Sequence, residues 1–322
     1  KDAANAFETI MSGDASPTQI GAFLMALRIR GESVSDITAG ATVLRSKMLK
    51  LESPAESMDI VGTGGDKSGS LNISTATAII VAGCGIPIAK HGNRAMSSKC
   101  GSADVLKELG VNIECNLSLV KESLFKAGLC FMLAPIHHSA MKHVGPSRVE
   151  LGTRSIFNLL GPLSNPASVT KILLGVFSKE WVDPLARVLK ELGTKSAWVV
   201  HGADGLDEIT LTGATYVSEL KNGKISSFEI NPQDAGLENI SASEIKGDDP
   251  KYNADALLAL LDGHKTSFRN VVLMNSAAAL IVANKVSSLT EGVTLAEKSI
   301  DKGNAKLVLD RMISITNGEL VD

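Results

Sequence analysis

The pattern of apolar and polar positions divides the chain into two parts. In the first fifty residues apolar side chains recur at helical spacing, and no segment alternates as a strand would. Residues 16–19 (Ser-Pro-Thr-Gln) form a capping box with proline in the first turn, which predicts a helix ending at Gly31. Ser33 and Asp36 predict the start of another helix. Residues 51–57 are typical of a linker.

From residue 58 onward, short apolar runs alternate with longer amphipathic segments. Continuous apolar strands joined by helices indicate a parallel sheet covered on both faces. We therefore predict an α/β fold, with a small all-helical domain and a large α/β domain whose central, mostly parallel sheet is flanked by helices. The predicted strands cover residues 59–61, 86–89, 130–133, 172–176 and 197–200, and the predicted helices cover 75–82, 103–109, 117–127, 180–192, 254–261, 276–283 and 294–315.

Two segments depart from the alternating pattern. Residues 137–160 are helical in character, and we expect them to return to the N-terminal helices. Residues 210–230 predict antiparallel strands joined by a hairpin turn at Asn222-Gly223. The predicted domains are 1–56, joined by a helical segment at about 140–165, and 57–322.

Composition limits the classes of function. A net charge of −3 and an aromatic content of 4% argue against general nucleic-acid binding. Cys84, Cys100, Cys115 and Cys130 form no C-x-x-C pair, so we expect reduced, buried cysteines in a cytoplasmic protein. The longest apolar run, 76–84, is too short to span a bilayer, and no signal peptide is visible.

A glycine-rich segment gives the first chemical signal. In residues 59–66 (Asp-Ile-Val-Gly-Thr-Gly-Gly-Asp), glycines let backbone N–H groups approach phosphate oxygens, and a predicted helix follows. The segment lacks the Gly-Lys-Ser/Thr of a P-loop and the third glycine of the dinucleotide fingerprint. Residues 72–75 (Asn-Ile-Ser-Thr) can cap a helix or bind phosphate, and the loop 97–104 can cover a phosphate or merely connect. The combination suits a sugar carrying several phosphates; an ordinary strand-to-helix turn is the alternative.

Charged residues suggest what accompanies such a ligand. Lys90 ends a predicted buried strand, which is unusual for lysine unless it meets an anion. Asp207 and Glu208 are adjacent carboxylates without a nearby Cys or His, so they suit Mg²⁺ rather than zinc; a solvated acidic pair is the alternative. Asp204 is a further candidate ligand, or the turn residue before Gly205.

Histidines and an arginine complete the candidate chemistry. His137, His138 and His143 lack the spacing of a zinc site, and one of them is better placed to line a pocket. Arg148 can bind a planar carboxylate through two hydrogen bonds, or form a surface salt bridge with Glu150.

Together these motifs resemble the anthranilate phosphoribosyltransferase family over essentially the whole chain. The resemblance implies transfer of phosphoribose from 5-phosphoribosyl 1-pyrophosphate to the amine of anthranilate, with Mg²⁺, in tryptophan biosynthesis. It also implies a helical domain, an α/β domain and a homodimer formed through the helical domains. It rests on residues 62–66, 72–75, 90–94 (Lys-His-Gly-Asn-Arg), 101–104 (Gly-Ser-Ala-Asp), 154–163, 165–166 and 201–208.

The resemblance also implies roles for single residues. Asp66, Lys90 and Asn93 would position the transition state, and no residue stands out as a catalytic acid, base or nucleophile. Mg²⁺ would be held by Ser74, Asp207 and Glu208. Phosphoribosyl pyrophosphate would be bound by Gly62, Thr63, Gly65, Asp66, Asn72, Ser74, Thr75, Lys90 and Ser102. Anthranilate would be bound by Gly62, His91, Asn93, His138 and Arg148, with Arg148 at its carboxylate.

The chain departs from the family pattern at two positions, and two other functions compete. Cys100 stands where serine is usual and Ser155 where threonine is common, and neither change removes a ligand. A pyrimidine nucleoside phosphorylase has a similar architecture but uses free phosphate. A non-catalytic, nucleic-acid-binding relative would lack the metal carboxylates, whereas this chain has both Asp207 and Glu208.

Overall fold

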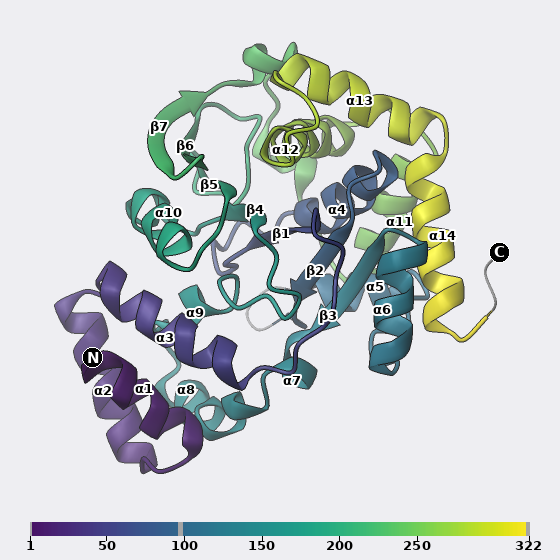
Figure 1. Cartoon of the computed structure of the whole chain (residues 1–322). Coiled ribbons are helices and arrows are strands. Elements are labelled where there is room, and N and C mark those ends of the chain that lie inside the picture. The colour runs from purple at the N-terminus through teal and green to yellow at the C-terminus, as the bar shows by residue number, and fades with distance from the viewer. Residues whose placement is uncertain (1, 96–98, 320–322) are drawn as a thin grey trace.

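A seven-stranded sheet forms the centre of the large domain in the computed structural model, which describes residues 2–95 and 99–319 (Figure 1). The strands are β1 (Met58–Gly62), β2 (Ile88–Gly92), β3 (Leu129–Leu133), β4 (Lys171–Gly175), β5 (Ser196–Gly202), β6 (Thr215–Lys221) and β7 (Lys224–Ile230). Their order is β3-β2-β1-β4-β5-β6-β7. The first five are parallel, and β6 and β7 are antiparallel. The predicted mostly parallel sheet and the hairpin at its edge are therefore confirmed.

Helices cover both faces of the sheet because successive strand residues point to opposite sides. Ile60 and Leu173 pack in the core formed with helices α4 and α12. Ile172 and Leu174 face the other way, into a core shared with α10 and the N-terminal helices. The helices of the large domain are α4 (Ile73–Gly83), α5 (Ser102–Glu108), α6 (Leu117–Lys126), η2 (Lys179–Trp181), α10 (Val182–Glu191), η3 (Pro232–Ala235), η4 (Ala242–Ile245), α11 (Pro250–Leu261), α12 (Ser267–Val282), α13 (Leu289–Asp301) and α14 (Asn304–Thr316).

The remaining helices gather at one end of the molecule, away from α13 and α14 (Figure 1). They are α1 (Asp2–Ser12), α2 (Pro17–Arg30), α3 (Val34–Lys47), α7 (Ala134–His137), η1 (Ser139–His143), α8 (Gly145–Leu151) and α9 (Phe157–Leu160). The capping boxes predicted at Ser16 and Ser33 are present. Helix α1 packs on η1, α2 on α8, and α3 on α9. Phe7 makes edge-to-face contacts with Phe23 and Phe157, at ring-centroid distances of 5.4 and 6.1 Å. The contact with Phe157 joins the N-terminal helices to the helices of the segment 134–160.

Several predicted boundaries were wrong. Strand β2 begins at Ile88 rather than at residue 86, and it continues to Gly92 rather than ending at residue 89. It continues because the polar residues Lys90 and His91 still pair with β3. The helix predicted over 294–315 is two helices, since Gly303 adopts a left-handed conformation with φ of 75° between α13 and α14. Helix α12 begins well before residue 276, because the Thr266 side chain accepts a hydrogen bond from the backbone N–H of Arg269.

Within the described residues no cysteine forms a disulfide, and only some of the cysteines are buried. Cys100 and Cys130 are buried, whereas Cys84 and Cys115 are half-buried, so the expectation of four buried cysteines was wrong for two of them. Within the described residues, no helix has both the length and the apolar character needed to cross a membrane.

Candidate active site

Four of the parallel strands end in glycine, and these carboxyl ends lie on the same side of the sheet. These residues are Gly62 on β1, Gly92 on β2, Gly175 on β4 and Gly202 on β5. Strand β1 lies between β2 and β4, so the chain winds in opposite directions on its two sides. Ligands of such sheets bind beyond the carboxyl ends of the strands at this switch point. The predicted glycine-rich loop leaves β1 at this position.

The segment carrying Asp207 and Glu208 crosses the ends of β1 and β4. A Cβ atom on Gly175 would lie 1.6 Å from the backbone oxygen of Asp207, and one on Gly62 would lie 2.6 Å from Asp207 Oδ2. Glycine is therefore required at the end of β4, and a Cβ atom at the end of β1 would displace the carboxylate of Asp207. Asp207 Oδ2 also accepts a hydrogen bond of 2.6 Å from the backbone N–H of Gly64. Sequence reasoning missed Gly175, whose only signal is a glycine at the end of an apolar strand.

Three carboxylates meet at this crossing. Asp66 Oδ2 accepts a hydrogen bond from the backbone N–H of Asp207 at 3.4 Å, and Glu208 Oε1 accepts one from the backbone N–H of Ser74 at 3.1 Å. Asp207 and Glu208 are buried. Burial is the main cause that raises the pKa of Asp207 to about 7, and repulsion from Asp66 is the second. Burial, followed by repulsion from Asp207, raises the pKa of Glu208 to about 8. Negative charge is thus concentrated where a cation would relieve it.

The donor set fits Mg²⁺ shared with a phosphorylated ligand. Among residues 2–95 and 99–319, no group of three or more His, Cys, Asp or Glu side chains forms a complete metal cage. Mg²⁺ usually takes one or two carboxylates together with water and substrate phosphates, which matches Asp207 and Glu208. Asp204 instead has the turn role: its Oδ2 accepts hydrogen bonds of 2.8 Å from the hydroxyls of Thr210 and Thr212.

Lys90 supplies positive charge beside these carboxylates. It is 2% exposed, and its Nζ donates a hydrogen bond of 2.6 Å to the backbone oxygen of Ile60. Burial lowers the pKa of Lys90, while the charges of Asp59 and Glu208 act to raise it. Asp59 is itself buried, which raises its pKa to about 6, and it accepts a 2.7 Å hydrogen bond from Asn165 Nδ2. Lys90, which was predicted to meet an anion, therefore lies near the carboxyl ends of the strands, beside these carboxylates.

The N-terminus of α4 faces the same edge and has no side-chain cap. Asn72 occupies the N-cap position but makes no hydrogen bond to the helix. Thr75 is buried, Ser74 is half-buried, and both lie in the first turn. The first turn of a helix has free N–H donors that attract anions. In the preceding loop, Thr63 Oγ1 accepts a 3.0 Å hydrogen bond from the backbone N–H of Phe177, so this hydroxyl anchors the loop to the end of β4.

The second loop returns to this site. Asp104 Oδ2 accepts hydrogen bonds from the backbone N–H groups of Ala95, at 2.9 Å, and Gly101, at 2.8 Å. One carboxylate thus holds both ends of the loop, and residues 96–98, within the predicted loop 97–104, lie outside the described residues. Ser102 Oγ donates to the backbone oxygen of Asn93 at 3.4 Å. The structure therefore brings two predicted site residues, Ser102 and Asn93, together.

His91 and His138 form an edge-to-face pair with ring centroids 5.0 Å apart. Both rings are buried, and Nε2 of His91 and both nitrogens of His138 make no well-formed hydrogen bond within the described chain. Burial, and then repulsion from nearby histidines, lowers the pKa of His91 well below its usual range and that of His138 to about 4. The pair is neutral and suits an apolar ring. His137 has a different role, since its Nδ1 lies 2.6 Å from the backbone oxygen of Leu49.

Arg148 is a half-buried cation without an internal anion. Its guanidinium lies 5.6 Å from the ring centroid of Phe157, and burial lowers its pKa. Among the residues that the structure describes, its side chain forms no ion pair or hydrogen bond, and the alternative salt bridge with Glu150 is not formed. An unpaired guanidinium of this kind can accept a carboxylate from a ligand.

Arg154 has a structural role that sequence reasoning did not assign. Its guanidinium lies 4.0 Å from the ring centroid of Phe177 and donates a hydrogen bond to the backbone oxygen of Gly65. Gly65 has a φ of 74°, and a Cβ atom there would lie 3.3 Å from Arg154 Nη2. Arg154 therefore supports the glycine-rich loop from the segment after α8. The only sequence signal was its membership in a motif.

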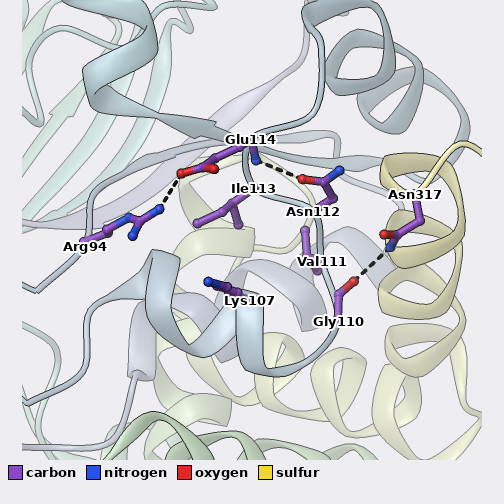
Figure 2. A pocket seen from close by; sticks show the side chains of 8 residues that line it. All are labelled: Arg94, Lys107, Gly110, Val111, Asn112, Ile113, Glu114 and Asn317. Carbon is purple, nitrogen blue, oxygen red and sulfur yellow. Dashed lines mark hydrogen bonds and ion pairs between the residues drawn. The ribbon is translucent and has the colours of Figure 1, made fainter.

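A separate pocket of about 250 Å³ lies beside α5 (Figure 2). Arg94 forms an ion pair with Glu114 there, and Asn317 Nδ2 donates a 2.9 Å hydrogen bond to the backbone oxygen of Gly110. None of the predicted site residues lines this pocket. Its lining residues are Arg94, Lys107, Gly110, Val111, Asn112, Ile113, Glu114 and Asn317.

Comparisons with known proteins agree with this arrangement. The model of the glycosyl transferase family α/β domain matches residues 54–306, and that of its helical bundle domain matches residues 1–48. The chain is 58% identical over 315 residues to an anthranilate phosphoribosyltransferase from Rhodopseudomonas palustris strain HaA2, covering 98% of this chain and 93% of the relative.

Solved structures give the same result. An anthranilate phosphoribosyltransferase from Thermus thermophilus superimposes with a TM-score of 0.93 at 40% identity, covering 98% of this chain and 95% of that one. The Saccharomyces cerevisiae enzyme in complex with PRPP and Mg has a TM-score of 0.90 at 31% identity, covering 98% and 93%. Its complex with 4-fluoroanthranilate has a TM-score of 0.88 at 31% identity, covering 98% and 92%. The chain therefore belongs to the glycosyl transferase family and, within it, to the anthranilate phosphoribosyltransferases.

Proposed function

We propose that the site at the β1/β4 edge transfers phosphoribose from 5-phosphoribosyl 1-pyrophosphate to the amine of anthranilate, releasing pyrophosphate in a step of tryptophan biosynthesis. The observation that carries the proposal is the burial of Asp207 and Glu208 against the glycine-rich loop, at the switch point of the sheet. Relatives solved with PRPP and Mg, and with 4-fluoroanthranilate, support both substrates.

The bond that breaks joins C1 of the ribose to pyrophosphate, and the bond that forms joins C1 to the amine nitrogen. The free N–H groups of α4 and the ammonium of Lys90 would bind phosphate oxygens. Asp207 and Glu208, with Ser74, would hold Mg²⁺, which when bound neutralises charge on the leaving pyrophosphate. Asp66, Lys90 and Asn93 would fix the donor for attack. Positioning and charge stabilisation then supply the catalysis.

The aromatic amine is neutral at pH 7, so its nitrogen can attack C1 without prior deprotonation. One N–H proton is lost as the N–C1 bond forms and passes to the released pyrophosphate or to solvent. Arg148 would bind the carboxylate of anthranilate through its planar guanidinium. The neutral rings of His91 and His138 would contact the aromatic ring without adding charge. This division of roles explains why the site contains no evident nucleophile or general base.

The test follows the loss of anthranilate fluorescence in the presence of phosphoribosyl pyrophosphate, with and without Mg²⁺. We expect Mg²⁺-dependent loss of fluorescence. Folded protein that shows no loss with Mg²⁺ present would overturn the proposal. Phosphorolysis of thymidine or uridine in a parallel assay would indicate a nucleoside phosphorylase instead.

We also propose a cytoplasmic homodimer formed through the helical domain. Ile29 on α2 is 82% exposed and Val149 on α8 is 72% exposed, and these two helices pack together. Strongly exposed apolar side chains on two helices that pack together suit a protein–protein contact. Light scattering during size-exclusion chromatography should give a dimer mass for the wild type and a monomer mass for Ile29→Asp. A monomeric wild type would refute the assignment.

A further inference from the structure

The segment 245–253, at the start of α11, braces the glycine-rich loop and the beginning of α4. Leu71 N–H donates to the backbone oxygen of Ile245, and Gly247 N–H donates to that of Gly69, both at 2.9 Å. A Cβ atom on Gly247 would lie 2.8 Å from the backbone oxygen of Ser70, so the two segments approach as closely as their backbones allow. This brace approaches α4 from a part of the chain that the sequence motifs did not include.

Asn253 connects this brace to Asn72 through a directed chain of amides. Asn253 is 3% exposed, and its Oδ1 accepts a 2.9 Å hydrogen bond from the backbone N–H of Asp248. Its Nδ2 therefore faces Asn72 and donates to Asn72 Oδ1 at 2.9 Å. Asn72 Nδ2 in turn donates to the backbone oxygen of Cys100 at 3.4 Å. The backbone N–H of Asp248 thus fixes the orientation of the side-chain amides of Asn253 and Asn72.

This chain explains why Asn72 stands at the N-cap of α4 without capping it. A free asparagine at this position would normally accept hydrogen bonds from the N–H groups of the first turn. Here its oxygen accepts hydrogen bonds from Asn253 Nδ2, at 2.9 Å, and from the Cys100 thiol, at 3.4 Å, so the helix N-terminus stays open to a ligand. The same side chain reaches the second loop at Cys100, and Lys99 of that loop pairs with Asp248 at 2.5 Å.

We infer that Asn253 is a positioning residue for phosphoribosyl pyrophosphate: it holds Asn72 away from the N-terminus of α4 and aligns the second loop with that terminus. The inference rests on the proposed function. Loss of the Asn253 donor leaves the oxygen of half-buried Asn72 with only the weaker thiol donor of Cys100, at 3.4 Å. The Asn72 side chain can then turn back onto the helix, where it competes with phosphate. Donor binding should weaken, while the acceptor side at Arg148 should be unaffected.

The experiment compares wild type, Asn253→Ala and Asn253→Asp with the control Ser299→Ala. Asn253→Asp keeps the shape and the acceptor for Asp248 but cannot donate to Asn72. Ser299 is also buried, and its hydroxyl donates a 3.0 Å hydrogen bond to the backbone oxygen of Ile80 near the opposite end of α4, so its loss reports general damage to the helix.

Both Asn253 variants should raise the KM for phosphoribosyl pyrophosphate by about tenfold, with little change in the KM for anthranilate. Ser299→Ala should leave both KM values near wild type, even where its unfolding temperature falls. Calorimetric titration with phosphoribosyl pyrophosphate and Mg²⁺ should show the same loss of affinity without turnover.

Unchanged donor affinity in a folded Asn253→Asp variant, or an equal change in Ser299→Ala, would overturn the inference while the turnover of the wild type stands. Wild-type protein that binds no phosphoribosyl pyrophosphate would overturn the proposed function and the positioning role together.

Discussion

Two arginines from the same segment should affect opposite substrates. Arg148→Ala removes a guanidinium that has no anionic partner in the described structure and lies 5.6 Å from the ring centroid of Phe157. Within the protein, this change removes a cation–π contact, which for a half-buried arginine is worth between about 0.5 and 2 kcal/mol. The substrate loses charge-assisted hydrogen bonds worth about 1.5–3 kcal/mol, so the KM for anthranilate should rise roughly 10- to 100-fold.

Arg154→Ala is the matched comparison, because it removes the same charge nearby. Its guanidinium supports the backbone of Gly65 and contacts the ring of Phe177, whereas that of Arg148 has no anionic partner among the described residues. We expect this change to raise the KM for phosphoribosyl pyrophosphate and to lower the unfolding temperature more than Arg148→Ala does. A third variant, Arg148→Lys, keeps the charge but loses the planar fork, and should recover little of the anthranilate affinity.

The assay is the initial rate of anthranilate fluorescence loss, measured while each substrate is varied at saturation of the other. Thermal unfolding of each variant reports the integrity of the fold. The assignment of Arg148 to the carboxylate fails if Arg148→Ala raises both KM values equally. It also fails if Arg154→Ala affects anthranilate as strongly as Arg148→Ala does.

Three further changes test the carboxylates, the glycine at the end of β4 and the histidine pair. The double variant Asp207→Asn with Glu208→Gln should lose most turnover and its response to Mg²⁺ in the fluorescence assay, and full activity would refute the metal assignment. Gly175→Ala places a Cβ atom 1.6 Å from the backbone oxygen of Asp207, so it should displace the carboxylates and abolish activity. Gly213→Ala, with open space at its Cβ, is its control and should change neither rate nor stability. The folded-state pKa of His138 is lowered from 6.5 to about 4, so below pH 6.5 the unfolded state binds the proton first. The free energy of unfolding should therefore fall from pH 6.5 toward pH 4, by up to roughly 3 kcal/mol for this group. Chemical denaturation should show a smaller fall for His138→Gln, and parallel curves for the two proteins would contradict the argument.

Local patterns along the chain determined the order of helices and strands in the large domain. Apolar runs and capping boxes depend on neighbouring residues, so they can be read without knowledge of distant contacts. The boundaries were less certain where pairing across the sheet extends a strand beyond its apolar run, as it does at Lys90. The motifs also named Asp207, Glu208 and Arg148 as candidates, because carboxylates suit Mg²⁺ and a guanidinium suits a carboxylate.

The tertiary structure alone decided how these groups act on one another. Asp207 and Glu208 have raised pKa values only because they are buried together, and that burial depends on the closeness allowed by Gly62 and Gly175. Asn253 carries no motif, yet its buried amide sets the direction of Asn72 across a contact between distant segments. Burial and hydrogen-bond direction are set when distant segments pack together, so they cannot be predicted from the spacing of residues along the chain.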